Sequence, residues 1–97
     1  MKRKNSQLLS NVLEDFFKDN PQLADKMAES RLVRAWGDVL GAGMQRYTSN
    51  LYVRNRCLYV QLTSSVVKNE LYYCREQLIK RLNEAVDRDV IDDIVFN

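Results

Sequence analysis

The most informative segment of the sequence is Trp36-Gly-Asp-Val-Leu-Gly41, followed by Thr48, by the run Leu58-Tyr-Val-Gln-Leu62 and by Ser65. It joins a helical pattern that ends at glycines to a segment in which apolar and polar residues alternate with a period of two. After Ser65 the apolar residues return to the spacing of a helix. We therefore expect a helix, two strands and a further amphipathic helix whose apolar face covers those strands.

A first helix is predicted over residues 6–19, where apolar side chains recur every three or four positions. The pair Asn20-Pro21 ends it, because proline disfavours helical geometry in the residue before it and suits the first turn of a following helix. The basic residues 1–5 are expected to form a flexible tail.

The second helix is expected to run from Pro21 to about Leu40 and to bury Trp36, the single tryptophan of the chain. Glycines follow it, and either Gly41 or Gly43 is expected to be its left-handed cap. We interpret Trp36 and Gly41 as structural residues. Removal of Trp36 should unfold the domain, and its indole N–H needs one hydrogen-bond partner when buried.

Residues 47–53 and 57–63 are rich in β-branched and aromatic side chains, which predicts two strands closed into a hairpin by residues 54–56. One continuous apolar stripe from Val67 to Ala85 predicts a single helix after the hairpin, capped by Ser64 or Ser65.

A final strand is predicted over residues 90–96. The order helix-helix-strand-strand-helix-strand predicts one two-layer α+β domain over residues 1–97, with a three-stranded mixed sheet covered by helices on one face. If the final strand is parallel to a hairpin strand, the crossover should be right-handed.

Composition points to one domain with one core, since the chain has 97 residues, 45% of them apolar, and a formal net charge of +2. No apolar stretch is long enough to span a bilayer and the basic start lacks an apolar signal segment, so we expect a cytoplasmic protein. Cys57 and Cys74 are expected to be reduced thiols.

Catalytic and metal chemistry have little support in this sequence. The chain contains no histidine, which removes the commonest general base and a common metal ligand. Asp92 and Asp93 are neighbours in a predicted strand and should point to opposite faces. Gly41-Ala-Gly43 lacks the lysine of a phosphate-binding loop and follows a helix. We therefore expect no enzyme, no cofactor and no metal site.

Charge is distributed unevenly along the chain. Residues 31–81 hold nine basic and three acidic side chains, whereas residues 82–97 hold one basic and five acidic. Such asymmetry could present a basic face to phosphates and an acidic face to a protein partner. The alternative is a mixed, solvated surface.

A nucleic-acid surface is expected on the hairpin and the open sheet face, because guanidinium groups suit phosphates and aromatic rings can stack on unpaired bases. Tyrosines that fill sheet or dimer contacts are the alternative. Arg56 occupies a turn position where glycine is preferred. The residues expected to bind nucleic acid are Arg46, Tyr52, Arg54, Arg56, Tyr59 and Lys68.

The whole pattern resembles the DciA family, whose shared domain is KH-like. The positions that carry the resemblance are Trp36, Gly41, Thr48, Leu58, Val60, Ser65 and Leu71, within a match that extends from Leu8 to Phe96. The resemblance implies a protein that loads or stimulates the replicative DNA helicase and contacts single-stranded DNA. The GxxG loop with which KH domains clamp a nucleic-acid backbone is absent from the sequence, so their binding mode is not implied.

The function expected from the sequence is therefore a non-enzymatic adaptor that binds the replicative helicase and, weakly, single-stranded DNA. Two alternatives remain open: an RNA-binding module, and a protein-interaction or homodimerisation domain without a nucleic-acid role.

Overall fold

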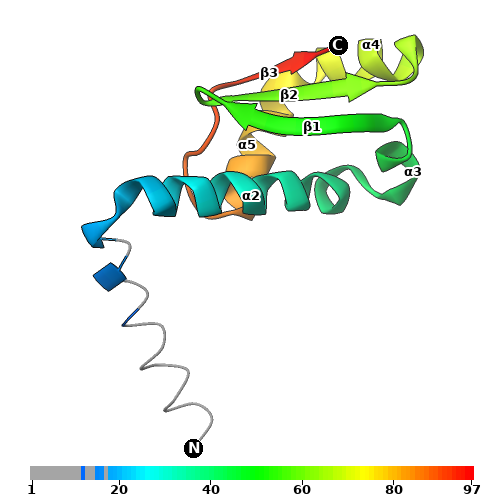
Figure 1. Cartoon of the computed structure of the whole chain (residues 1–97). Helices are drawn as coiled ribbons and strands as arrows, with labels where there is room; N and C mark the ends of the chain where they lie inside the picture. Colours follow the sequence, from blue (N-terminus) through cyan, green and yellow to red (C-terminus); the bar gives the residue numbers. More distant parts are fainter. Residues whose placement is uncertain (1–11, 13–14, 17) are drawn as a thin grey trace, which may run out of the picture.

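The computed structural model describes residues 12, 15–16 and 18–97 (Figure 1). The predicted basic tail and most of the first predicted helix lie outside the described residues. The described positions from 12 to 19 are helical. No helix in the described part is long and apolar enough to cross a membrane.

Helix α2 spans Pro21–Leu40, as predicted, and proline occupies its first turn. It ends at Gly41, which has φ +88° and ψ 158° and whose N–H donates to the Gly37 carbonyl at 2.8 Å. Only glycine adopts this backbone region readily. The short helix α3, Ala42–Gln45, was not predicted, and Gly43 lies inside it.

The sheet contains strands β1 (Thr48–Arg54), β2 (Cys57–Leu62) and β3 (Asp93–Phe96) in the order β1-β2-β3. The first two are antiparallel and β3 is parallel to β2, so the predicted mixed sheet is confirmed. A two-residue turn closes the hairpin, with φ of 52° at Asn55 and 61° at Arg56. Positive φ at both positions is typical of the type I′ turn that matches the twist of a hairpin.

A β-bulge interrupts β1 near its start. Thr48 pairs with Leu62 and Asn50 pairs with Gln61, which leaves Ser49 as the extra residue. An extra residue reverses the side-chain alternation. Thr48 therefore lies on the same face of the sheet as Leu62, the face that the helices cover.

The single helix predicted after the hairpin is instead two helices, α4 (Ser65–Tyr73) and α5 (Arg75–Ala85), separated at Cys74. A continuous helix of this length would extend about 30 Å at 1.5 Å per residue. The strands beneath it reach only about 20 Å at 3.3 Å per residue. The break therefore keeps both apolar stripes over the sheet. Ser64 caps α4 by accepting a hydrogen bond from the Val67 N–H at 3.3 Å.

The final strand is shorter than predicted and begins at Asp93 instead of Val90. Asn83 is the reason, because its side-chain oxygen accepts the N–H groups of Val90 at 2.9 Å and Ile91 at 3.1 Å. Its amide group also donates to the Ile91 carbonyl at 2.9 Å. These backbone groups are therefore bound to α5 and cannot join the sheet.

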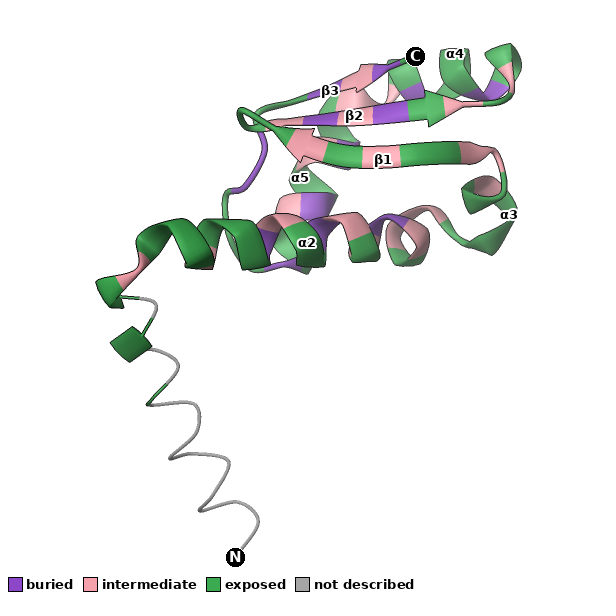
Figure 2. Cartoon of the chain, viewed as in Figure 1, coloured by how far each residue is buried: buried purple, intermediate pink, exposed green. Residues whose placement is uncertain are grey.

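The core lies between the sheet and the helices, and Figure 2 shows buried positions alternating with others along β2. Trp36 is completely buried, and its indole N–H donates to the Thr48 hydroxyl at 3.0 Å. The other fully buried large side chains come from helices, strands and the segment before β3: Leu32, Leu58, Val60, Leu82, Ile91 and Ile94. The predicted two-layer α+β fold, with the helices on one face, is confirmed.

Candidate nucleic-acid interface

No element in the described part of the chain covers the face of the sheet opposite the helices. Leu58 and Val60 point into the core, so the side chains between them point outward. Pairing places the same alternation on the neighbouring strands. The residues of this open face are Asn50, Tyr52, Arg54, Cys57, Tyr59, Gln61, Asp93 and Val95.

Two tyrosines form the centre of the open face. Tyr52 and Tyr59 are directly opposite each other in the β1–β2 register. Their rings are stacked, with centroids 4.9 Å apart and planes inclined by 10°. Tyr52 remains 46% exposed, whereas Tyr59 is half-buried. One face of each ring is covered by the other ring. An incoming base would therefore stack on the exposed face of the Tyr52 ring.

Arg54 lies at the hairpin end of the same face, two residues from Tyr52 on β1. It is exposed, and its guanidinium makes no ion pair or hydrogen bond within the described part of the chain. An uncompensated guanidinium next to an exposed ring can bind a phosphate while the base stacks.

Arg56 is engaged elsewhere. Its Nε and Nη2 donate to the two carboxylate oxygens of Asp92, both at 2.8 Å. Its Nη1 donates to the Asp89 carbonyl at 3.1 Å, and Nη2 lies 3.2 Å from that residue's carboxylate. These contacts join the hairpin tip to the acidic segment before β3 and leave the charge of Arg56 compensated.

The pKa values of this pair follow from the contact. The hydrogen bonds that Arg56 donates lower the pKa of Asp92, and they raise the pKa of Arg56 above its ordinary value. Both groups therefore stay ionised at neutral pH. Of the two hairpin arginines expected to contact nucleic acid, only Arg54 offers an uncompensated charge.

The remaining expected contacts lie away from the tyrosines. Arg46 follows α3, at the end of β1 opposite the hairpin turn, where its Nε donates to the Gly43 carbonyl at 3.2 Å. Its guanidinium lies 5.9 Å from the centre of the Tyr47 ring. Lys68 is on α4, on the helical side of the sheet. The six expected residues thus do not form one continuous patch, and their nucleic-acid role stays a prediction.

The acidic and cysteine side chains of the described residues are mostly engaged or separate from one another. Among these residues, no group of three or more acidic or cysteine side chains is arranged to hold a metal ion. Cys57 and Cys74 are free thiols. Burial, with a smaller contribution from the charge of Asp93, raises the pKa of the Cys57 thiol. Asp92 and Asp93 pair separately with Arg56 and Arg75.

Sequence reasoning missed the residues that link segments distant in the chain. Asp92 was considered only as one half of an acid pair, although it binds an arginine 36 positions earlier. Tyr72 and Arg75, whose side chains lie near β3, were not selected. Tyr72 does carry a signal, because it falls outside the apolar stripe formed by Val67 and Leu71.

The described residues form a two-layer KH-like α+β domain with one sheet face that no described element covers. A family model described as "Dna[CI] antecedent, DciA" matches residues 8–96. The chain belongs to the DciA family, which confirms the resemblance in the sequence. The family takes part in DNA replication, where its name implies helicase loading, and it is not a family of enzymes. A comparison with curated proteins finds no match to this chain.

Proposed function

We propose that this chain is a non-enzymatic adaptor in DNA replication that binds the replicative helicase and, through the open sheet face, single-stranded DNA. Membership of the DciA family supports the proposal that the replicative helicase is a partner of this chain. The proposal that the open sheet face binds DNA rests on one observation, the stacked pair Tyr52–Tyr59 beside the uncompensated Arg54.

The arrangement favours weak binding without base selectivity. One exposed ring and one free guanidinium supply stacking and one phosphate contact, and a stacked base contributes about 1–3 kcal/mol. Aromatic faces accept every base, so discrimination between sequences should be small.

The helicase part is tested by co-elution of the purified chain with the replicative helicase of the same organism on size exclusion. A stable complex is the expected result. Two intact, folded proteins that elute separately would contradict it.

The DNA part is tested by fluorescence anisotropy with a labelled oligothymidylate of about 20 nucleotides, long enough for site sizes of roughly 4–16 nucleotides. Arg54→Glu should weaken binding and reduce the salt slope by about one. Lys80→Glu makes the same charge change at an exposed position of α5 and should have a smaller effect. Equal losses in both variants would remove the open face from the proposal.

The alternatives are resolved by the same material. Tighter binding of an oligouridylate of equal length and salt would favour an RNA-binding module. If the chain forms a dimer as its concentration rises, and mutation of Tyr52 abolishes that dimer, the open sheet face would be a self-association surface.

A further inference from the structure

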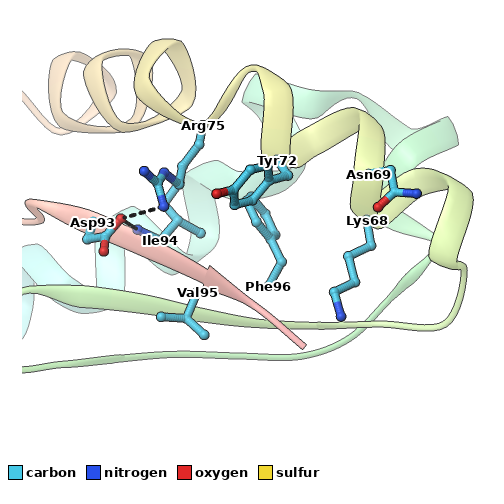
Figure 3. A pocket seen from close by; sticks show the side chains of 8 residues that line it. All are labelled: Lys68, Asn69, Tyr72, Arg75, Asp93, Ile94, Val95 and Phe96. Carbon is cyan, nitrogen blue, oxygen red and sulfur yellow. Dashed lines mark hydrogen bonds and ion pairs between the residues drawn. The ribbon is translucent and has the colours of Figure 1, made fainter.

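A hollow of about 430 Å³ lies between the helices and the outer edge of β3 (Figure 3). Side chains from α4 and α5 form one wall, and side chains of β3 form the other. The residues that matter are Lys68, Asn69, Tyr72, Arg75, Ile94 and Phe96. The hollow opens at the outer edge of β3, where Asp93 and Val95 also line it, and neither Tyr52 nor Tyr59 does.

The outer edge of β3 carries backbone groups that β2 does not use. Asn97 donates to the Val60 carbonyl at 2.8 Å and accepts from the Leu62 N–H at 2.9 Å. Because residues alternate along a parallel ladder, Ile94 and Phe96 direct their backbone groups away from β2. No strand in the described part pairs with this edge.

One of these groups already has a partner. The Ile94 N–H donates to the carboxylate of Asp93 at 2.8 Å, and the Arg75 guanidinium lies 3.5 Å from the same carboxylate. The Ile94 carbonyl and the Phe96 N–H remain. Their spacing suits one residue of an added parallel strand. The N–H of that residue would donate to the Ile94 carbonyl, and its carbonyl would accept from the Phe96 N–H.

The walls of the hollow are suited to an apolar side chain. Tyr72 is 58% exposed, and its ring lies 5.3 Å from the guanidinium of Arg75. Figure 3 shows Tyr72 and Arg75 reaching over β3, while Val95 points to the other side of the strand. Arg75 and Asp93 compensate each other. The Lys68 ammonium group makes no ion pair or hydrogen bond within the described residues, so it leaves one positive charge at the rim.

From these features we propose that the edge of β3 and the adjoining hollow bind an extended peptide segment of a protein partner by strand addition. The segment pairs with the Ile94 carbonyl and the Phe96 N–H. It places an apolar or aromatic side chain between Tyr72 and Phe96, and a carboxylate on Lys68.

A peptide fits this site better than a nucleic acid. Strand addition uses the edge hydrogen bonds directly, whereas an unpaired nucleic acid needs several free cations along its backbone. Among the described residues that line the hollow, Lys68 alone is a free cation. The α4–α5 junction also carries Tyr73 and Cys74, where a glycine-rich connection would let a phosphate backbone approach.

The test begins with selection from a displayed library of random 12-residue peptides on the whole chain, followed by synthesis of the enriched peptides. Enriched sequences should alternate apolar residues and contain an acidic one. Addition of such a peptide to ¹⁵N-labelled chain should shift the amide resonance of Phe96 and slow its hydrogen exchange.

Two exposed positions test the walls without disturbing the core. Lys68→Glu and Tyr72→Ala should each weaken peptide binding at least about tenfold. The matched controls are Lys80→Glu and Tyr73→Ala, both exposed and outside the hollow, and they should leave binding within about twofold. These variants remain folded because they alter no buried side chain.

The proposal is overturned by any of three results: no enriched peptide, shifts that map away from Phe96, or equal affinity in Tyr72→Ala and Tyr73→Ala. An oligothymidylate that produces the Phe96 shifts in place of the peptides would assign the hollow to nucleic acid, which also overturns it. The outcome does not depend on the DNA surface, because Tyr52 and Arg54 are on the opposite face of the sheet.

Discussion

The indole N–H of Trp36 reaches the hydroxyl of Thr48 because the bulge at Ser49 turns Thr48 toward the helices. With regular alternation from Tyr52, Thr48 would lie on the open face and the indole would have no acceptor there. The contact therefore joins the end of α2 to the start of β1. It explains why Trp36 and Thr48 occur together in the most informative segment of the sequence.

Replacement of Thr48 by valine should lower the free energy of unfolding by about 1–2 kcal/mol. The methyl group preserves the shape of the side chain, while the buried indole N–H loses its partner, a loss that typically costs about 1–3 kcal/mol. Urea denaturation monitored by circular dichroism measures the difference.

Two further variants identify the indole as the cause. Thr48→Ser keeps the hydroxyl that accepts the indole N–H, so it should cost less than Thr48→Val. Thr63→Val makes the same change at an exposed threonine, whose hydroxyl donates to the Tyr47 carbonyl at 3.3 Å, and should also cost less than Thr48→Val because no buried N–H loses its partner. An equal cost in Thr48→Ser and Thr48→Val would show that Thr48 acts by another route.

Asn83→Ala should destabilise the protein by about 2–3 kcal/mol, because the N–H groups of Val90 and Ile91 lose their acceptor together. Asn83→Asp keeps that acceptor and loses the amide group that donates to the Ile91 carbonyl and to the exposed Asp89 carboxylate, so it should cost less in a buffer of high ionic strength that screens its repulsion from Asp89. The urea midpoints of unfolding of the two variants show which of them is less stable. The reverse order would mean that the donated hydrogen bond dominates.

Asp92→Asn should reduce stability at neutral pH and have no effect in strong acid. Since the folded pKa of Asp92 is lowered, its contribution is present above the unfolded value of about 3.9 and disappears as pH falls through the folded pKa. Thermal unfolding from pH 2 to pH 7 gives the comparison. Asp38→Asn removes a carboxylate far along the chain from Arg56 and supplies the baseline. A difference that stays the same from pH 7 down to the lowest pH measured would contradict the ion-pair explanation.

Tyr52→Ala should weaken binding of an oligothymidylate by about 1 kcal/mol or more, the lower end of the range for a stacked base. Tyr73→Ala removes a tyrosine that is 87% exposed on α4 and should leave DNA binding unchanged. Anisotropy titrations at one fixed salt concentration measure both. Similar losses would indicate that exposed tyrosines act without regard to position.

Cys57 should react slowly with iodoacetamide at pH 7.5 in a Cys74→Ser background. Burial and the charge of Asp93 raise the pKa of its thiol, so the thiolate fraction is smaller than in the urea-unfolded chain. The stability that this group contributes is present below its ordinary pKa of 9.0 and is lost as pH rises through the raised value. Mass spectrometry follows the reaction in both states.

An Asp93→Asn variant separates charge from access. If the carboxylate raises the pKa, the native reaction should become faster in this variant. An unchanged rate would mean that the reagent is limited by access to the thiol.

Local patterns were enough to predict the architecture. Pro21 and Gly41 delimit α2, and the alternation around Leu58 and Val60 fixes which face of β2 is buried. These features depend on neighbours in sequence, where periodicity and backbone preference are informative. The element order then leaves few ways to assemble one sheet and one helical layer.

Features that depend on distant contacts were not predictable in the same way. Nothing near Val90 in the sequence indicates that its N–H will donate to the Asn83 side chain. Nothing in the hairpin indicates that Arg56 will bind the Asp92 carboxylate. The expected DNA surface therefore included an arginine that the fold uses to join two segments. The helix break at Cys74 was missed as well, because a heptad interval from Leu71 to Leu78 keeps an apolar stripe continuous through it.

The bulge at Ser49 also makes the two edges of the sheet unequal. If β3 of one molecule could extend onto β1 of the next, the contact would be head-to-tail and could continue into a fibre without limit. A bulge increases local twist and disrupts regular pairing at an edge. The edge that β1 presents is therefore a poor template, and strand addition at β3 ends with a single added segment.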